Sequence, residues 1–270
     1  SVGTVTSGFE VTDQDFSNVE YGSIAGTKFV DADGVAGGDD QTAYTEGWKI
    51  YLFNSDPGAD PDLGAAYKEA TTDASGNYTF DNLLPGTYWV AEESKTGWTN
   101  VTPVVVSVGT VTSGFEVTDQ DFSNFELFQI SGTKYEDHNG NGTINESDQG
   151  LQGWTVFIDA DDDNVLDVDD PNTVADEAEK FAITDINGNW SITGLDWTYD
   201  GLKVKEVMQN GWVQTLAPVT TIAGTSGNDQ TGFDFANFEQ FDISGYKWAD
   251  LDNSATWNED SIAVLDGWTI

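Results

Sequence analysis

The chain has 270 residues and a formal net charge of -39, because 48 acidic residues face only nine lysines and no arginine. A surface this acidic repels phosphates and anionic lipid heads, which excludes nucleic acid as a partner. Cysteine is absent, so disulfides, thiolate metal sites and thiol nucleophiles are excluded as well. No apolar run approaches the roughly 20 residues of a membrane-spanning helix, and we expect no membrane insertion in this segment.

An internal repeat organises the chain. Residues 1–18 recur letter for letter at 107–124, and a looser third copy lies at 231–239. These copies predict that the sequence begins and ends inside a repeat. The expected segments are the C-terminal strands of a preceding repeat at 1–20, complete domains at 21–127 and 128–240, and the N-terminal strands of a following repeat at 241–270.

Within each complete unit the elements are expected in the same order. In the first unit they are the opening segment 23–33, a Gly-Trp step at Trp48, a turn and strand at 72–80, the segment 88–98, and the closing copy at 107–124. These stretches are short and rich in Val, Thr, Phe, Tyr and Trp, and Gly, Asn and Asp turns separate them without a sustained helical period. The pattern predicts an all-β fold of tandem, immunoglobulin-like β-sandwich domains.

The most regular acidic loop follows the opening strand of the second unit. Its oxygen-bearing residues alternate as in the calcium loop of an EF-hand, and Gly142 permits the sharp turn between them. Both this loop and the next one close on Asp instead of the usual bidentate Glu, which favours weak, extracellular-type affinity. The predicted calcium ligands of this loop are Asp137, Asn139, Asn141, Thr143, Asn145 and Asp148.

A second acidic loop lies a short distance further along the chain, with predicted ligands Asp159, Asp161, Asp163, Asp167 and Asp170. Carboxylates this close repel one another by about 1 kcal/mol per pair even in water, so the empty loop should splay open. Bound calcium would convert that cost into folding free energy.

Two further loops keep only part of the spacing. An alternative interpretation of all four loops is that they are solvated acidic turns, and another is that the acidity is an adaptation to high salt. The partial ligand sets are Asp31, Asp33, Asp39 and Asp40 in the first unit, and Asp250, Asp252, Ser254 and Asn258 near the end of the chain.

A lysine recurs at one position of the opening strand, on the same side as a core isoleucine by the alternation of a β-strand. A buried glutamate could shuttle protons while a neutral lysine amine attacks an Asn side-chain amide, releasing ammonia and leaving an isopeptide bond. The alternative is a buried, hydrogen-bonded Lys-Glu ion pair capped by Asn. The candidate sets are Lys28, Glu92 and Asn124 in the first unit, and Lys134, Glu206 and Asn237 in the second.

Several motifs together resemble a known family: GTKYEDHNGNG, GLQGW, DINGNWSITGL, KEVMQNGW and the closing FANFE. The chain is similar along its length to the SdrD B-like and CnaB-type repeat domains of bacterial surface adhesins. This resemblance implies a β-sandwich stalk module, rigidified by calcium in EF-hand-like loops that lack EF-hand helices. It also implies Lys-Asn or Lys-Asp isopeptide bonds in some relatives.

These observations predict a calcium-binding structural repeat of an extracellular protein, placed on a cell surface or in a secreted filament. Its expected partners are neighbouring repeats or subunits of the same protein, including those of a filament. A ligand-binding adhesin module that recognises a host, matrix or glycan target is the alternative. We expect no enzyme, because the lone His138 lies inside a calcium loop and the sequence contains neither a nucleophile elbow nor a phosphate loop.

Overall fold

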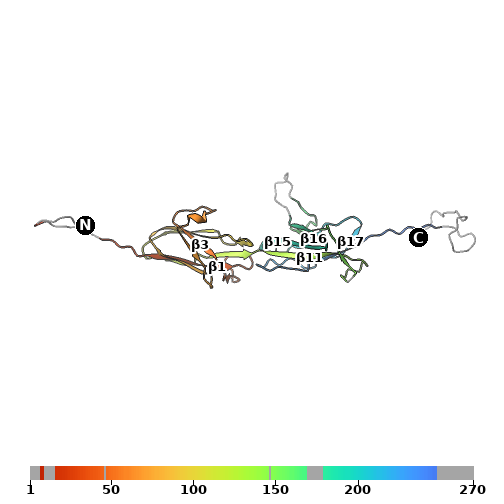
Figure 1. Ribbon diagram of the computed structural model, residues 1–270, viewed down its shortest axis with the longest axis horizontal. Coiled ribbons are helices and arrows are strands. Elements are labelled where there is room, and N and C mark those ends of the chain that lie inside the picture. Colours follow the sequence, from red (N-terminus) through yellow and green to blue (C-terminus); the bar gives the residue numbers. More distant parts are fainter. Residues whose placement is uncertain (1–6, 9–15, 46, 146, 169–178, 248–270) are drawn as a thin grey trace, which may run out of the picture.

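The computed structural model describes residues 7–8, 16–45, 47–145, 147–168 and 179–247. Two β-sandwiches lie end to end, and the described chain enters the pair at one end and leaves at the other (Figure 1). We call residues 21–127 repeat 1 and residues 128–240 repeat 2. None of the helices found in the described part of the chain has the length and apolar character needed to cross a membrane.

Repeat 1 consists of two sheets that face each other. The six-stranded sheet has the order β2-β1-β10-β7, with β5 and β9 also paired to β1, and the four-stranded sheet has the order β4-β3-β6-β8. The elements are β1 (Gly22–Val30), β2 (Thr42–Ala43), β3 (Lys49–Phe53), the short 3-10 helix η1 (Leu63–Ala65), β4 (Lys68–Thr71), β5 (Asn77–Leu83), β6 (Gly86–Glu92), β7 (Trp98–Asn100), β8 (Val105–Val111), β9 (Glu116–Val117) and β10 (Phe122–Glu126).

Repeat 2 follows the same plan, with fewer strands among its described residues. Its larger sheet has the order β12-β11-β18-β17 with β15 also paired to β11, and its smaller sheet has the order β14-β13-β16. The elements are β11 (Phe128–Glu136), β12 (Gln149–Gly150), β13 (Thr155–Asp159), β14 (Phe181–Ile183), β15 (Asn189–Leu195), the 3-10 helix η2 (Trp197–Tyr199), β16 (Lys203–Glu206), β17 (Trp212–Leu216) and β18 (Phe235–Glu239).

The first and last strands of each repeat are neighbours and run parallel. In repeat 1, Lys28 lies opposite Phe122 and Val30 lies opposite Asn124. The pairing of β11 with β18 repeats this register in repeat 2, where Lys134 lies opposite Phe235 and Glu136 lies opposite Asn237. Since residues two apart share one face of a strand, the lysine of the first strand and the asparagine of the last strand point to the same side of the sheet.

The sandwich interiors are apolar and aromatic. Along β1, buried residues alternate strictly with partly exposed ones from Gly22 to Lys28, as the sequence pattern predicted. Ile24, Trp48 and Phe122 belong to the buried cluster of repeat 1, and Ile130 occupies the same place as Ile24 in repeat 2. The predicted all-β, tandem sandwich architecture is confirmed.

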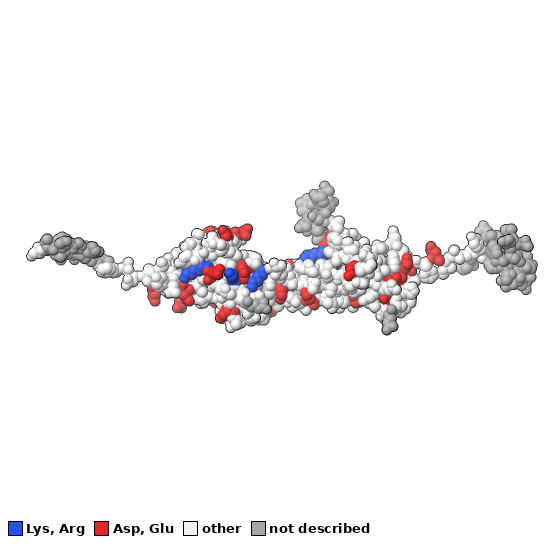
Figure 2. All heavy atoms as spheres, in the orientation of Figure 1, with Lys and Arg blue, Asp and Glu red and all other residues white. Residues whose placement is uncertain are grey.

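Charge is distributed unevenly over the surface. Acidic side chains are scattered over the visible face of both repeats, whereas the visible lysine atoms gather in a band on repeat 1 and a small group on repeat 2 (Figure 2). Two of the nine lysines, Lys28 and Lys134, are fully buried and neutralise nothing at the surface. Most of the surface acidity is therefore left to solvent cations.

The hairpin turn before β15 packs closely against the backbone of β11. Gly188 has a φ of +79°, and a Cβ there would lie 2.2 Å from the carbonyl oxygen of Lys134. We expect Gly188→Ala to destabilise repeat 2 by about 3 kcal/mol or more in denaturant unfolding, because the turn must move off β11. Gly153→Ala is the matched control.

Gly153 has a φ of +80° but open space around its missing side chain. Its substitution should therefore cost only the left-handed backbone penalty of about 1 to 2 kcal/mol. Equal losses of stability for the two variants would contradict the crowding argument.

Candidate metal loops and a buried Lys-Glu-Asn cluster

The loop after β13 holds the strongest candidate for a cation site. Asp159 ends β13 with 2% of its surface exposed, and neither of its carboxylate oxygens has a hydrogen-bond partner. Asp159, Asp161 and Glu179 each offer a carboxylate oxygen, and these three atoms lie within 4.8 Å of one another. Burying an unpaired carboxylate is costly, and hard oxygen ligands in this arrangement suit a divalent cation such as calcium.

A second group of carboxylates overlaps the first. Asp161, Asp163 and Asp167 also bring oxygens within 4.8 Å of one another. Asp162 and Asn164 adopt positive φ angles of 65°, which turn the short loop sharply between these side chains. The described members of the predicted set are thus gathered on one loop, and the predicted closing residue, Asp170, lies outside the described residues.

Glu179 is the residue that sequence reasoning missed. It precedes β14, and its carboxylate accepts the backbone N–H of Ala160 at 2.6 Å and that of Asp167 at 3.2 Å, so it joins the two ends of the loop. Burial raises the pKa of Glu179, and the nearby charges of Asp159 and Asp167 act in the same direction. The only sequence signal was an acidic residue just before a strand, outside the contiguous window in which an EF-hand spacing is sought.

The loop that follows β11 is closed by its own hydrogen bonds. The buried Asp137 accepts the N–H of Gly142 at 2.7 Å and that of Asn141 at 3.2 Å. Burial alone would raise the pKa of Asp137, but these amides and the side chain of Thr215 outweigh it and lower the pKa. At the other end, Asp148 accepts the N–H of His138 at 3.2 Å.

The amide side chains of this loop make local turns. Asn139 accepts the N–H of Asn141 at 3.1 Å, Asn141 accepts that of Thr143 at 2.7 Å, and Asn145 accepts that of Ser147 at 3.1 Å. The oxygens of Asn139 and Asn141 each retain a second lone pair that these bonds do not use, whereas Asn145 Oδ1 also accepts the hydroxyl of Ser147 at 2.6 Å. The predicted ligands therefore lie on one compact loop with oxygens still able to accept a cation.

The corresponding loop of repeat 1 is less regular. Asp31, Asp33 and Asp40 bring carboxylate oxygens within 4.8 Å of one another, whereas the exposed Asp39 is not part of that group. The buried Asp31 is already bound by Ser123 Oγ at 3.0 Å and by the N–H of Gly34 at 2.7 Å. The last predicted set, Asp250, Asp252, Ser254 and Asn258, lies outside the described residues.

Between the two sheets of repeat 1, Lys28 meets Glu92. Lys28 Nζ lies 3.2 Å from Glu92 Oε2, and both side chains are fully buried. The amine also lies 4.6 Å from the centroid of the Trp48 ring. Asn100 donates to Glu92 and, at 3.3 Å, to Asn124 Oδ1, so the three predicted residues converge with Asn100 as an unpredicted fourth member.

This burial moves both charged groups toward neutrality. Desolvation raises the pKa of Glu92 to about 7, against the opposing charge of Lys28. Desolvation also lowers the pKa of Lys28 to about 8, against the opposing charge of Glu92. Both shifts favour the neutral forms of the two side chains.

Repeat 2 has the same arrangement with one change of partner. Lys134 Nζ lies 3.0 Å from Glu206 Oε2 and 4.4 Å from the centroid of the Trp154 ring, and burial lowers the pKa of Lys134 to about 8. Gln214 takes the place of Asn100 and donates to Glu206 at 2.7 Å. The side chain of Asn237 is fully buried, and its Oδ1 has no hydrogen-bond partner.

Comparison with known proteins gives matches over much of the chain. Residues 39–121 match the family described as SpaA, a prealbumin-like fold domain. Serine-aspartate repeat-containing protein D of Staphylococcus aureus strain Newman is 28% identical over 178 residues, which cover 62% of this chain and 12% of that protein. Colossin-C of Dictyostelium discoideum is 27% identical over 210 residues, covering 72% of this chain and 20% of that protein.

Among solved structures, the shaft pilin SpaA from Lactobacillus rhamnosus GG aligns with a TM-score of 0.32 and 14% identity, covering 84% of this chain and 100% of the pilin chain. The chain thus spans a small part of the first curated relative and a length comparable to that of the pilin. Together with the fold, the family match and the similarity to the serine-aspartate repeat protein confirm the resemblance found in the sequence to the SdrD B-like and CnaB-type β-sandwich domains.

Proposed function

We propose that this chain is a calcium-stabilised structural segment of an extracellular, cell-surface protein and serves as part of a stalk or filament. The observation that carries the proposal is the pair of partnerless carboxylate oxygens on the buried Asp159, next to Asp161 and Glu179. The similarity to a serine-aspartate repeat-containing protein supports a role as a repeat segment of a longer protein.

The net charge supports a role for bound cations. A formal charge of -39 destabilises the folded chain by self-repulsion, and calcium bound at the loops would offset part of it. Calcium bound to the folded state alone adds to the free energy of unfolding by mass action. Residues 159–167 with Glu179 are the first site we assign, and the loops at 137–148 and 31–40 are the next.

The strand order suits a segment that transmits tension. Because β1 and β10 are parallel neighbours, a pull on the two ends of repeat 1 draws these strands past each other along their length. The hydrogen bonds between them are then loaded together and in shear. The same holds for β11 and β18 in repeat 2.

We also propose a covalent bond between these paired strands. The neutral amine of Lys28 attacks the side-chain carbonyl carbon of Asn124, a new C–N bond forms, and the former amide nitrogen leaves as ammonia while Glu92 passes the proton to it. The convergence of Lys28, Glu92 and Asn124 in one buried space supports this reaction. Lys134, Glu206 and Asn237 would react in the same way.

Calcium should raise the melting temperature of the full chain. We expect a midpoint several degrees higher in millimolar calcium than in chelator, since a ligand at about 100 times its Kd adds about 2.7 kcal/mol of stability. Sodium chloride at matched ionic strength is the control for general screening. A midpoint that does not move with calcium, or moves equally with sodium, contradicts calcium stabilisation.

Glu179→Gln should weaken calcium binding in isothermal titration. The substitution preserves side-chain size but removes a negative ligand oxygen from the group with Asp159 and Asp161, so we expect affinity at that site to fall at least about tenfold. The exposed Glu116 in β9 provides the control, Glu116→Gln. An unchanged titration for Glu179→Gln would remove this residue from the site.

Intact-mass measurement tests the covalent bond. We expect the chain to be lighter by about 17 Da, the mass of one ammonia, for each repeat that reacts. Glu92→Gln should restore that mass in repeat 1 only, and Glu206→Gln in repeat 2 only, so each variant is a control for the other. A full-length chain at its unmodified mass would show that the buried groups remain an ion pair.

A further inference from the structure

The junction between the two repeats is built around one tryptophan. Trp197, in η2 at the entrance of repeat 2, packs edge-on against Phe125 of repeat 1 with ring centroids 5.3 Å apart. Gly34 of the repeat 1 metal loop lies directly beside the indole, because a Cβ on that glycine would be 2.0 Å from the ring. Phe125 is fully buried in an apolar cluster that also contains Phe128 of repeat 2, and Trp197 packs against this cluster. Repeat 1 thus provides a socket, and Trp197 fills it.

A second contact fixes the linker at the same junction. The backbone N–H of Glu126 donates to Ser226 Oγ at 2.7 Å, and the N–H of Gly227 donates to the carbonyl oxygen of Glu126 at 2.8 Å. The N–H of Ser226 donates at 3.1 Å to the carbonyl oxygen of Ala32, which lies in the metal loop. One turn of repeat 2 therefore holds both the linker and the metal loop of the repeat before it.

The same linker contact occurs at the entrance of repeat 1. There the N–H of Glu20 donates to Ser113 Oγ at 2.8 Å, and the N–H of Gly114 donates to the carbonyl oxygen of Glu20 at 3.0 Å. Glu20, Glu126 and Glu239 occupy the same position of the sequence repeat. The contact is thus a recurring device that joins successive repeats, and Glu239 is the next residue placed to make it.

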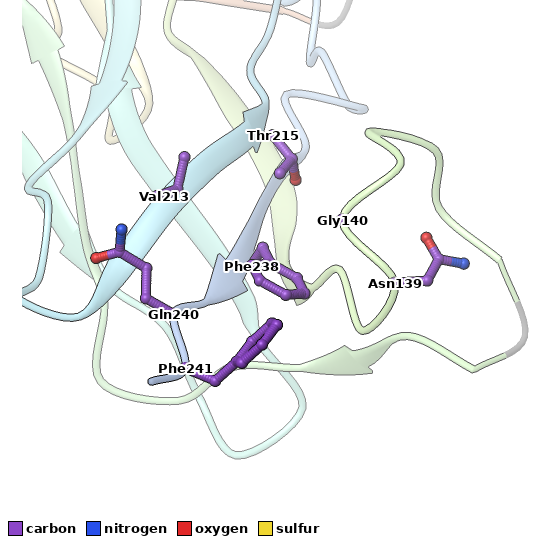
Figure 3. A pocket seen from close by; sticks show the side chains of 7 residues that line it. All are labelled: Asn139, Gly140, Val213, Thr215, Phe238, Gln240 and Phe241. Atoms are coloured by element: carbon purple, nitrogen blue, oxygen red, sulfur yellow. The ribbon is translucent and has the colours of Figure 1, made fainter. Parts of the chain in front are cut away.

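The end of repeat 2 from which the chain leaves, here called its exit face, carries a pocket equivalent to the socket that Trp197 fills. A pocket of about 490 Å³ is lined by Asn139, Gly140, Val213, Thr215 and Phe238, among others (Figure 3). Gly140 and Phe238 align with Gly34 and Phe125, the two residues that hold Trp197 in the first junction. Phe238, however, is only partly buried, whereas Phe125 is covered completely.

We propose that this pocket is the docking socket for a further copy of the repeat, filled by an aromatic side chain placed as Trp197 is in repeat 2. The inference rests on the proposed function as a repeat segment and names the contact that joins the segments. Val213, Phe238 and Phe241 give the pocket an apolar wall, and an incoming ring would meet Phe238 edge-on as Trp197 meets Phe125.

The expected occupant of the pocket is a repeat that resembles repeat 2 and not repeat 1, and the entrance of repeat 1 shows why. There the chain passes directly from β5 to β6 through Leu84, in place of the Trp-bearing 3-10 turn, and Leu84 is 51% exposed. Phe238 makes one wall of the pocket aromatic, and an indole placed as Trp197 is in repeat 2 can pack against it. Asn139 and Gly140 also belong to the candidate calcium loop at 137–148, so that loop forms part of the docking face.

The existing junction tests the premise in the chain as it stands. Trp197→Ala should accelerate hydrogen exchange at the amides of Ser226 and Gly227 at least about tenfold in saturating calcium. Ile186→Ala, which truncates an apolar side chain that is 72% exposed on a hairpin turn, is the control and should leave both amides unchanged. Unaltered exchange in Trp197→Ala would overturn the socket.

The exit face is then tested in a longer chain, in which residues 1–240 are followed directly by a second copy of residues 128–247. We expect the amides of the added copy that correspond to Ser226 and Gly227 to be protected to within about threefold of the originals. Val213→Asp in the first copy of repeat 2 should abolish that protection without unfolding the repeat, since Val213 is 45% exposed. Its effect on the original junction should be nil.

Exchange of the added amides at the unprotected rate, or protection that survives Val213→Asp, would overturn the docking proposal. Protection of amides within the β11 and β15 strands of the added copy reports that it is folded. The stalk proposal would fail separately: the melting temperature would not change with calcium, while the junction amides would remain protected.

Discussion

The parallel pairing of each repeat's first and last strands is the constraint on which the other features depend. Because β1 and β10 run in the same direction, the chain enters a sandwich at one end and leaves at the other, and the next repeat continues the line. The loop after β1 is carried to the exit end, beside the following repeat. The same register puts Lys28 and Asn124 on one face, where Glu92 of the opposite sheet reaches them.

Charge is handled differently inside the sandwiches and at their loops. In the interior, each buried lysine meets one glutamate and an aromatic ring, and desolvation draws the pKa values of Lys28 and Glu92 toward neutrality. At the loop after β13, Lys203 pairs with Asp162, but the carboxylate oxygens of the buried Asp159 have no hydrogen-bond partner. The first arrangement pairs opposite charges within the protein, whereas the proposed function assigns a cation to the second.

The junction between the two repeats connects these local features from one repeat to the next. Trp197 contacts both the core residue Phe125 and Gly34, which lies in the candidate metal loop after β1. A change in the shape of that loop would therefore alter the junction, because the loop packs against Trp197 and accepts the hydrogen bond from Ser226 at Ala32. The loop after β1 therefore contributes both to its own repeat and to the junction with the next one.

The sequence by itself determined the repeat, the all-β class, the burial of Lys28 beside Ile24, and the order of oxygen-bearing side chains along each loop, because these are local or periodic properties. Only the tertiary structure decided that Glu179 joins Asp159, that Asn100 and Gln214 complete the lysine clusters, and that Trp197 fills a socket on the preceding repeat. Those contacts join residues far apart in the chain, and only strand register and sheet packing determine which of them meet.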